Sequence, residues 1–189
     1  MILGAVLLAG GAVHAASYRD AVSVPPVEVF RSMIRYSDAN QMDKITGSLI
    51  VLAPILNHIK EKFKNDPRSD IENAIGTGDS AKVLRSVQAL VVWDIKDLLE
   101  ESLLQVQTSV DQGKTSIKIA RMEYEILSPA VQKRNFSSDQ VIKKAFMNLY
   151  QTISSDVYSG QSSAPNIARA QESLIQIGLI LGKEFLDLG

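Results

Sequence analysis

Apolar residues recur at alternating intervals of three and four over most of this chain, and this spacing constrains its fold more than any other feature. Residues spaced in this way lie on one face of an α-helix. In the first such segment they are Met42, Ile45, Leu49, Leu52, Leu56, Ile59 and Phe63. The pattern predicts an amphipathic helix over residues 40–64. Pro54 inside this segment predicts a kink, because proline lacks a backbone N–H and its ring clashes with the preceding turn.

Helix start and stop signals follow this first segment. Asp66 and Pro67 are typical of an N-cap and a first helical position, and they predict a short helix that ends near Gly76. Asp79 is the next N-cap candidate. It opens the longest periodic stretch of the chain, which is expected to stop at Gly113.

Three more apolar stripes cover residues 115–131, 142–157 and 167–185. In the first of them Pro129 predicts a bend or an early end. The second follows a capping-box arrangement at residues 137–140. No segment alternates apolar and polar residues between hairpin turns as a strand would, so the fold class expected from the sequence is all-α.

The lengths of these segments predict the architecture. Long helices with short connections pack best as antiparallel neighbours. We therefore expect a single domain over residues 40–189, an up-and-down four-helix bundle with one or more extra short helices. Residues 17–39 are expected to form an extended N-terminal arm, because the run Val24-Pro25-Pro26-Val27 favours extended backbone.

The first sixteen residues are uncharged and resemble an export signal. Their apolar run leads into Val13-His14-Ala15, where a signal peptidase would read small residues, and it is short of the ~17–25 residues that cross a bilayer. The first charge is Arg19, so the basic lead of a bacterial signal is missing. This pattern favours the inner part of a two-stage targeting sequence. An atypical one-step signal and an uncleaved helix stay open as alternatives.

Composition excludes several classes of function. The chain has no cysteine, which rules out a thiol nucleophile and cysteine-ligated metal centres. Lys and Arg total 20 against 21 for Asp and Glu, a balance that argues against nucleic acid as the main partner. His58 is the only histidine beyond residue 16, so neither a di-iron carboxylate bundle nor a Ser–His–Asp triad has its residues. We expect no catalytic residues and no cofactor, and therefore not an enzyme.

One pair of residues is a candidate ligand site. His58 and Glu61 are three positions apart, on one face of the first helix, and resemble the His-x-x-Glu motif of imelysin-type periplasmic proteins. Lysines at positions 60, 62 and 64 surround Glu61, which favours a solvated polar face over a metal site. We expect no metal here and keep His58 and Glu61 as the alternative.

Basic residues gather around the end of the same helix and the turn after it. They are Lys60, Lys62, Lys64 and Arg68. Cations near a helix C-terminus complement its dipole, so stability explains part of the cluster. The alternative is a docking patch for an acidic surface of a partner protein. Pro25 and Pro26 in the arm are a second docking candidate.

The layout as a whole resembles the PsbQ-type extrinsic proteins of photosystem II. The shared features are an apolar targeting segment ending in Val13-His14-Ala15, the absence of cysteine, and an all-α bundle after a proline-containing arm. The resemblance implies a non-enzymatic subunit in the thylakoid lumen of a chloroplast. Such a subunit docks peripherally on the lumenal face of photosystem II and stabilises the oxygen-evolving centre, without spanning the membrane. The alternative is a bacterial periplasmic bundle that binds a small ligand or metal through His58 and Glu61.

Overall fold

The computed structural model describes residues 18–153 and 166–186, which form eight α-helices and no strand. The helices are α1 (Pro26–Asp38), α2 (Met42–Val51), α3 (Ala53–Phe63), α4 (Pro67–Gly76), α5 (Ser80–Val106), α6 (Val110–Arg134), α7 (Phe136–Ile153) and α8 (Ile167–Phe185). The all-α class expected from the apolar spacing is confirmed. The targeting segment proposed for residues 1–16 lies outside the described residues.

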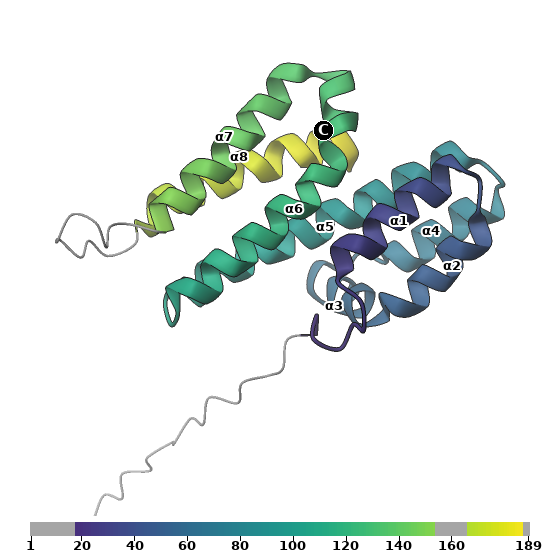
Figure 1. The fold of residues 1–189 in the computed structure, drawn as a ribbon, viewed down its shortest axis with the longest axis horizontal. Coiled ribbons are helices and arrows are strands. Elements are labelled where there is room, and N and C mark those ends of the chain that lie inside the picture. Colours follow the sequence, from purple (N-terminus) through teal and green to yellow (C-terminus); the bar gives the residue numbers. More distant parts are fainter. Residues whose placement is uncertain (1–17, 154–165, 187–189) are drawn as a thin grey trace, which may run out of the picture.

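Helices α5 to α8 form the up-and-down part of the fold (Figure 1). Each of them packs against the next in the chain, and α8 returns to contact α5. The short helices α1 to α4 form a second group, in which α1, α3 and α4 pack against α5. The long helix α5 therefore joins the two groups and carries residues that face both. No helix in the described part of the chain is long and apolar enough to cross a membrane.

Several predicted helix boundaries are confirmed by their capping bonds. The side chain of Asp66 accepts a hydrogen bond from the Ser69 amide at the start of α4. Asp79 does the same for Ala81 and Lys82 at the start of α5. The interruption predicted by the proline at position 54 occurs at residue 52, where α2 gives way to α3 and the proline sits in the first turn of α3.

The extended arm expected over residues 17–39 is wrong for most of its length, because Pro26–Asp38 form α1. Pro26 lies in the first turn, where its fixed φ suits a helix and no hydrogen bond needs its missing N–H. Phe30 and Met33 are fully buried on the face of α1 that packs against the other helices. The adjacent prolines therefore mark a helix start, and the apolar stripe of residues 27, 30 and 33 continues the pattern found later in the chain.

Gly113, expected to end the longest helix, instead lies inside α6. A Cβ at this position would lie 2.3 Å from Val106 Cγ2 and 2.9 Å from the Ser102 carbonyl oxygen, both on α5. The glycine is needed because α5 and α6 approach each other closely here. The same helix, α6, continues through Pro129 to Arg134, so the early end considered for Pro129 is wrong.

Candidate functional site

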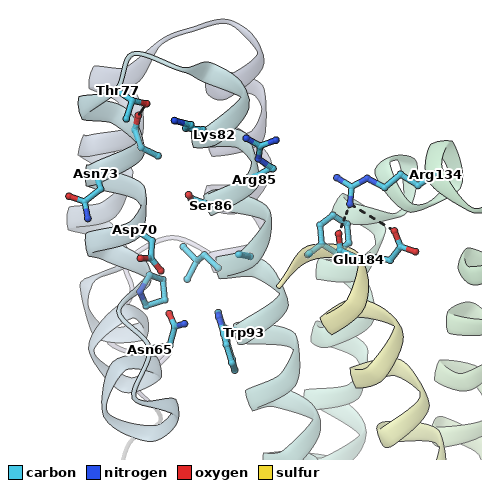
Figure 2. Close-up of a pocket in the computed structure, with 15 residues that line it drawn as sticks. Asn65, Asp70, Asn73, Thr77, Lys82, Arg85, Ser86, Trp93, Arg134 and Glu184 are labelled. Carbon is cyan, nitrogen blue, oxygen red and sulfur yellow. Dashed lines mark hydrogen bonds and ion pairs between the residues drawn. The ribbon is translucent and has the colours of Figure 1, made fainter. Parts of the chain in front are cut away.

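A cleft of about 610 Å³ opens between α4 and α5 and extends to the C-terminal ends of α6 and α8 (Figure 2). This volume lies within the range of about 300–1,000 Å³ usual for ligand pockets. The residues that line it are mostly polar and come from five places in the chain: Asn65, Pro67, Asp70, Asn73, Ala74, Thr77, Lys82, Arg85, Ser86, Ala89, Leu90, Trp93, Arg134, Glu184 and Phe185. The helix α5 supplies most of one wall. In Figure 2, Lys82 and Ser86 project from it into the space between α4 and α5.

Local structure fixes the two walls of the cleft. Thr77 follows α4 and closes its last turn by donating to the Ala74 carbonyl over 2.7 Å. Gly78 then adopts φ +69°, a conformation that glycine reaches without strain, and Asp79 caps α5. This tight turn brings α5 back alongside α4, so that Lys82 lies across the cleft from α4.

Two cations of the cleft have no acidic partner. Lys82 and Arg85 make no side-chain hydrogen bond or ion pair with any residue that the structure describes. The third cation, Arg134, donates to the Glu184 carbonyl, lies 3.9 Å from a Glu184 carboxylate oxygen and stacks over the Phe185 ring at 5.0 Å. Lys82 and Arg85 therefore present positive charge to the cleft that no carboxylate of the described chain neutralises.

The cleft also contains acidic and neutral polar groups. Burial, together with the nearby charge of Asp66, raises the pKa of Asp70 above its usual value. Asn65 Oδ1 is buried and accepts no hydrogen bond within the described residues, and Trp93 supplies a flat apolar surface beside it. An anionic group carried on an apolar or aromatic body fits the lining of the cleft.

The basic patch expected at Lys60, Lys62, Lys64 and Arg68 is mostly neutralised within the chain. Lys60 pairs with Asp66 at 2.5 Å, and Lys62 pairs with Asp97 at 2.7 Å and Glu100 at 3.0 Å. Arg68 donates to the Leu49 carbonyl over 2.8 Å and lies 3.5 Å from Glu72. Lys64 alone is left without an ion pair in the described part of the chain, and it occupies the left-handed end of α3. Asp66 and Glu72 are close to these cations in the sequence, whereas Asp97 and Glu100 are brought to Lys62 from α5 by folding.

His58 and Glu61 are not brought together. His58 Nε2 lies 3.1 Å from Asp97 Oδ1, and its ring stacks on Tyr18 with centroids 3.9 Å apart. Glu61 is exposed and contacts neither of them. No cluster of three or more potential ligands among the described residues could hold a metal ion. The metal or ligand site considered for the His58 and Glu61 face therefore gains no support from the geometry.

A second charged network lies inside the bundle, which the sequence analysis missed. Arg19 pairs with Asp94 at 2.7 Å and with Glu123 at 2.6 Å, and both carboxyl groups are fully buried. Tyr18 donates a hydrogen bond to Asp97, which Lys62 also contacts. These residues come from the N-terminal segment, α3, α5 and α6. The sequence signal was a set of acidic residues at positions 94, 97 and 123 that fall on the buried faces of their helices.

The buried carboxyl groups of this network titrate differently from free ones. Burial and the neighbouring Asp94 charge raise the pKa of Glu123 well above its usual value. The shift favours the protonated form of Glu123, and burial raises the pKa of Asp94 as well, although Arg19 opposes both shifts. Glu123 Oε2 is buried and has no hydrogen-bond partner among the described residues. Burial would raise the pKa of Asp97 as well, but hydrogen bonds from Lys62 and Tyr18 keep it below its usual value.

A second cavity of about 820 Å³ borders this network. Arg19 forms part of its wall, together with Pro25 and Pro26, the residues proposed for docking from the sequence. The remaining charged groups are acidic: Asp20, Glu101 and Asp111. The prolines therefore shape the mouth of an acidic cavity at the start of α1.

No family model matches the chain, and no curated protein and no solved structure matches it significantly.

Proposed function

We propose that this chain is a non-enzymatic binding subunit that docks through the cleft between α4 and α5 on an acidic segment of a partner protein. The observation that carries the proposal is the pair Lys82 and Arg85, which line a cleft of about 610 Å³ without an acidic partner among the described residues. Opposite charges across an interface steer association and select the partner.

The proposal keeps the docking function expected from the sequence but changes its location. Most cations of the patch at Lys60 to Arg68 form ion pairs within the chain, so little of its positive charge is left for a partner. Lys82 and Arg85 lie one helical turn apart on α5, and Trp93 lines the cleft two to three turns further along the same helix. An acidic segment lying along the cleft would meet the two cations at one end and the aromatic surface of Trp93 further along, a composition typical of interface centres.

The resemblance to the PsbQ-type proteins supplies the specific partner of the proposal. In that case the acidic segment belongs to the lumenal face of photosystem II, and the chain helps to stabilise the oxygen-evolving centre from the thylakoid lumen. Support for this partner comes from the layout of the sequence, and support for the docking surface comes from the cleft.

The test is rebinding of the full chain to photosystem II membranes that have been washed with salt. The variant Lys82→Glu/Arg85→Glu reverses both cleft charges. The matched control, Lys144→Glu/Arg169→Glu, makes the same change at two exposed cations of α7 and α8 that have no acidic partner in the described residues. Arg169 lies at the opposite end of α8 from the residues that line the cleft.

We expect the wild-type chain to bind at low salt and to be released at high salt, because exposed charges are screened. The cleft variant should bind at least about tenfold more weakly, equivalent to about 1.4 kcal/mol, and the control within about twofold. Failure of the wild-type chain to bind would refute photosystem II as partner. An equal loss for both variants would refute the cleft as the docking surface.

A further inference from the structure

The side chain of Arg19 occupies a binding site whose walls belong to other parts of the chain. Its Nη1 lies 2.7 Å from both carboxyl oxygens of Asp94, and its Nη2 lies 2.6 Å from Glu123 Oε1. Asp94 and Glu123 stand 75 and 104 residues away along the chain, on α5 and α6. The planar fork of a guanidinium ion matches this arrangement of oxygens, and an ammonium ion does not.

The carboxyl groups lie on helices, and the arginine that pairs with them lies in a turn. Asp94 and Glu123 are fully buried on two long helices that pack along each other. Arg19 belongs to a turn before α1, which is closed by the hydrogen bond from the Val22 amide to the Arg19 carbonyl over 3.1 Å. The bundle thus holds the acidic groups, and a short segment outside the helices supplies the guanidinium group.

The acidic cavity provides a route to the site. Arg19 lies in the wall of the 820 Å³ cavity, and its side chain is 9% exposed. Asp20, Glu101 and Asp111 line the same cavity without a further cation. The acidic walls attract a small cation into this cavity, and Arg19 is the lining residue that contacts both Asp94 and Glu123.

We propose that Asp94 and Glu123 form a binding site for alkylguanidinium ions, filled in cis by Arg19 and available to a free alkylguanidinium ion when that side chain is absent. The ligand class is a guanidine with a short aliphatic substituent. This inference concerns the opposite charge and a different cavity from the docking cleft, so each can fail without the other.

The experiment uses the full chain with Arg19→Ala and methylguanidinium as the probe, with methylammonium at equal concentration as the chemical control. Arg31→Ala is the matched protein control, because Arg31 forms an exposed pair with Glu28 on the surface of α1. Thermal unfolding is followed by circular dichroism over a millimolar titration. If Arg19→Ala does not fold alone, the same titration is read as recovery of its helical signal.

We expect a saturable rise in the Tm of Arg19→Ala of about 3–6 °C at a tenfold excess over the Kd, or the matching recovery of helicity. The wild-type chain and Arg31→Ala should not respond, and Arg19→Ala/Asp94→Asn should lose the response. A response that is absent, that methylammonium reproduces, or that survives Asp94→Asn would overturn the proposal.

Discussion

Arg19 donates a hydrogen bond of 2.6 Å to Glu123 inside the bundle, although 104 residues separate them in the chain. The contact ties the segment that precedes α1 to the middle of α6. The residues just after the proposed targeting segment are therefore part of the packed fold, and the charge of Arg19 faces the buried carboxyl groups of Asp94 and Glu123.

The protonation of Glu123 is tested by comparing Glu123→Gln with Asp94→Asn. The raised pKa of Glu123 predicts a neutral acid at pH 7, and glutamine is a neutral amide of the same shape, so we expect Glu123→Gln to destabilise the fold by less than about 1 kcal/mol. Asp94→Asn leaves Arg19 without its buried counter-charge, and we expect a loss of about 3–5 kcal/mol. Urea denaturation measures both free energies of unfolding.

The difference in stability between the wild-type chain and Glu123→Gln should depend on pH. The pKa of Glu123 is higher in the folded than in the unfolded chain, so ionisation favours unfolding as pH rises above the unfolded value of about 4.3. The wild-type chain should therefore lose stability relative to Glu123→Gln between about pH 4 and pH 7. A difference that stays constant over this range would show that Glu123 is ionised in the fold.

The contribution of Asp139 to the stability of the fold has the opposite pH dependence. Asp139 is fully buried at the junction of α6 and α7, and it accepts hydrogen bonds from Tyr124 over 2.6 Å and Ser128 over 2.7 Å. Burial alone would raise its pKa, but these bonds, with those of Lys143 and Gln132, lower the pKa to about 2.

A lowered pKa stabilises the fold above the unfolded value of about 3.9, and this contribution is lost as pH falls toward about 2. We expect Asp139→Asn to lose about 1.5–3 kcal/mol at pH 7, and the gap from wild type to shrink between about pH 4 and pH 2. Asp38→Asn, at an exposed residue without partners among those described, should stay within about 0.5 kcal/mol. Urea midpoints across this pH range are the readout, and a gap that widens in acid would contradict the assignment.

Two glycines inside helices should respond in opposite directions to alanine. At Gly113 a Cβ would collide with Val106 and the Ser102 carbonyl on α5, so we expect Gly113→Ala to destabilise the fold by about 1–3 kcal/mol. At Gly47 in α2 a Cβ meets nothing within 4 Å, and Gly47→Ala should stabilise by about 0.5–1 kcal/mol. Thermal unfolding of the two variants measures the close approach of α5 and α6. Equal effects would mean that the helices are further apart.

Double-mutant cycles distinguish the two partners considered for His58. The stacked rings of Tyr18 and His58 should give a coupling energy of about 0.5–1.5 kcal/mol when both are replaced by alanine. The cycle of His58 with Glu61 should give a coupling near zero, because Glu61 points to solvent and contacts neither residue. A larger coupling of His58 with Glu61 than with Tyr18 would support His58 and Glu61 as a functional pair.

The fold was largely predictable because helical spacing is a local property. The caps at Asp66 and Asp79 and the break near Pro54 could be read directly from neighbouring residues. Gly113 and Pro26 were misread because each residue has two structural uses, and the choice depends on what packs beside it. A glycine can end a helix, or it can lie inside a helix where another helix packs closely against it. A proline favours extended backbone, but it also favours the first turn of a helix.

The candidate site was less predictable because it depends on contacts between distant segments. The partner of Lys62 on α5 and the α2 carbonyl that accepts from Arg68 cannot be predicted from any spacing in the sequence. Only the pair of Arg68 and Glu72, four positions apart on α4, has a spacing that predicts it. The sequence does not identify Lys82 and Arg85 as site residues, because the cleft forms only when α4, α5, α6 and α8 pack together.

The docking proposal is tested most directly by cross-linking from inside the cleft. Because the chain has no cysteine, Ser86→Cys introduces a single attachment point for a photoreactive maleimide in the cleft wall, and Gln176→Cys places the same label on an exposed position of α8. Each labelled full-length chain is bound to salt-washed photosystem II membranes and irradiated. We expect the label at position 86 to join the chain to an acidic lumenal segment, and high salt to abolish this product. Equal products from both positions, or none from position 86 while the chain is bound, would contradict docking through the cleft.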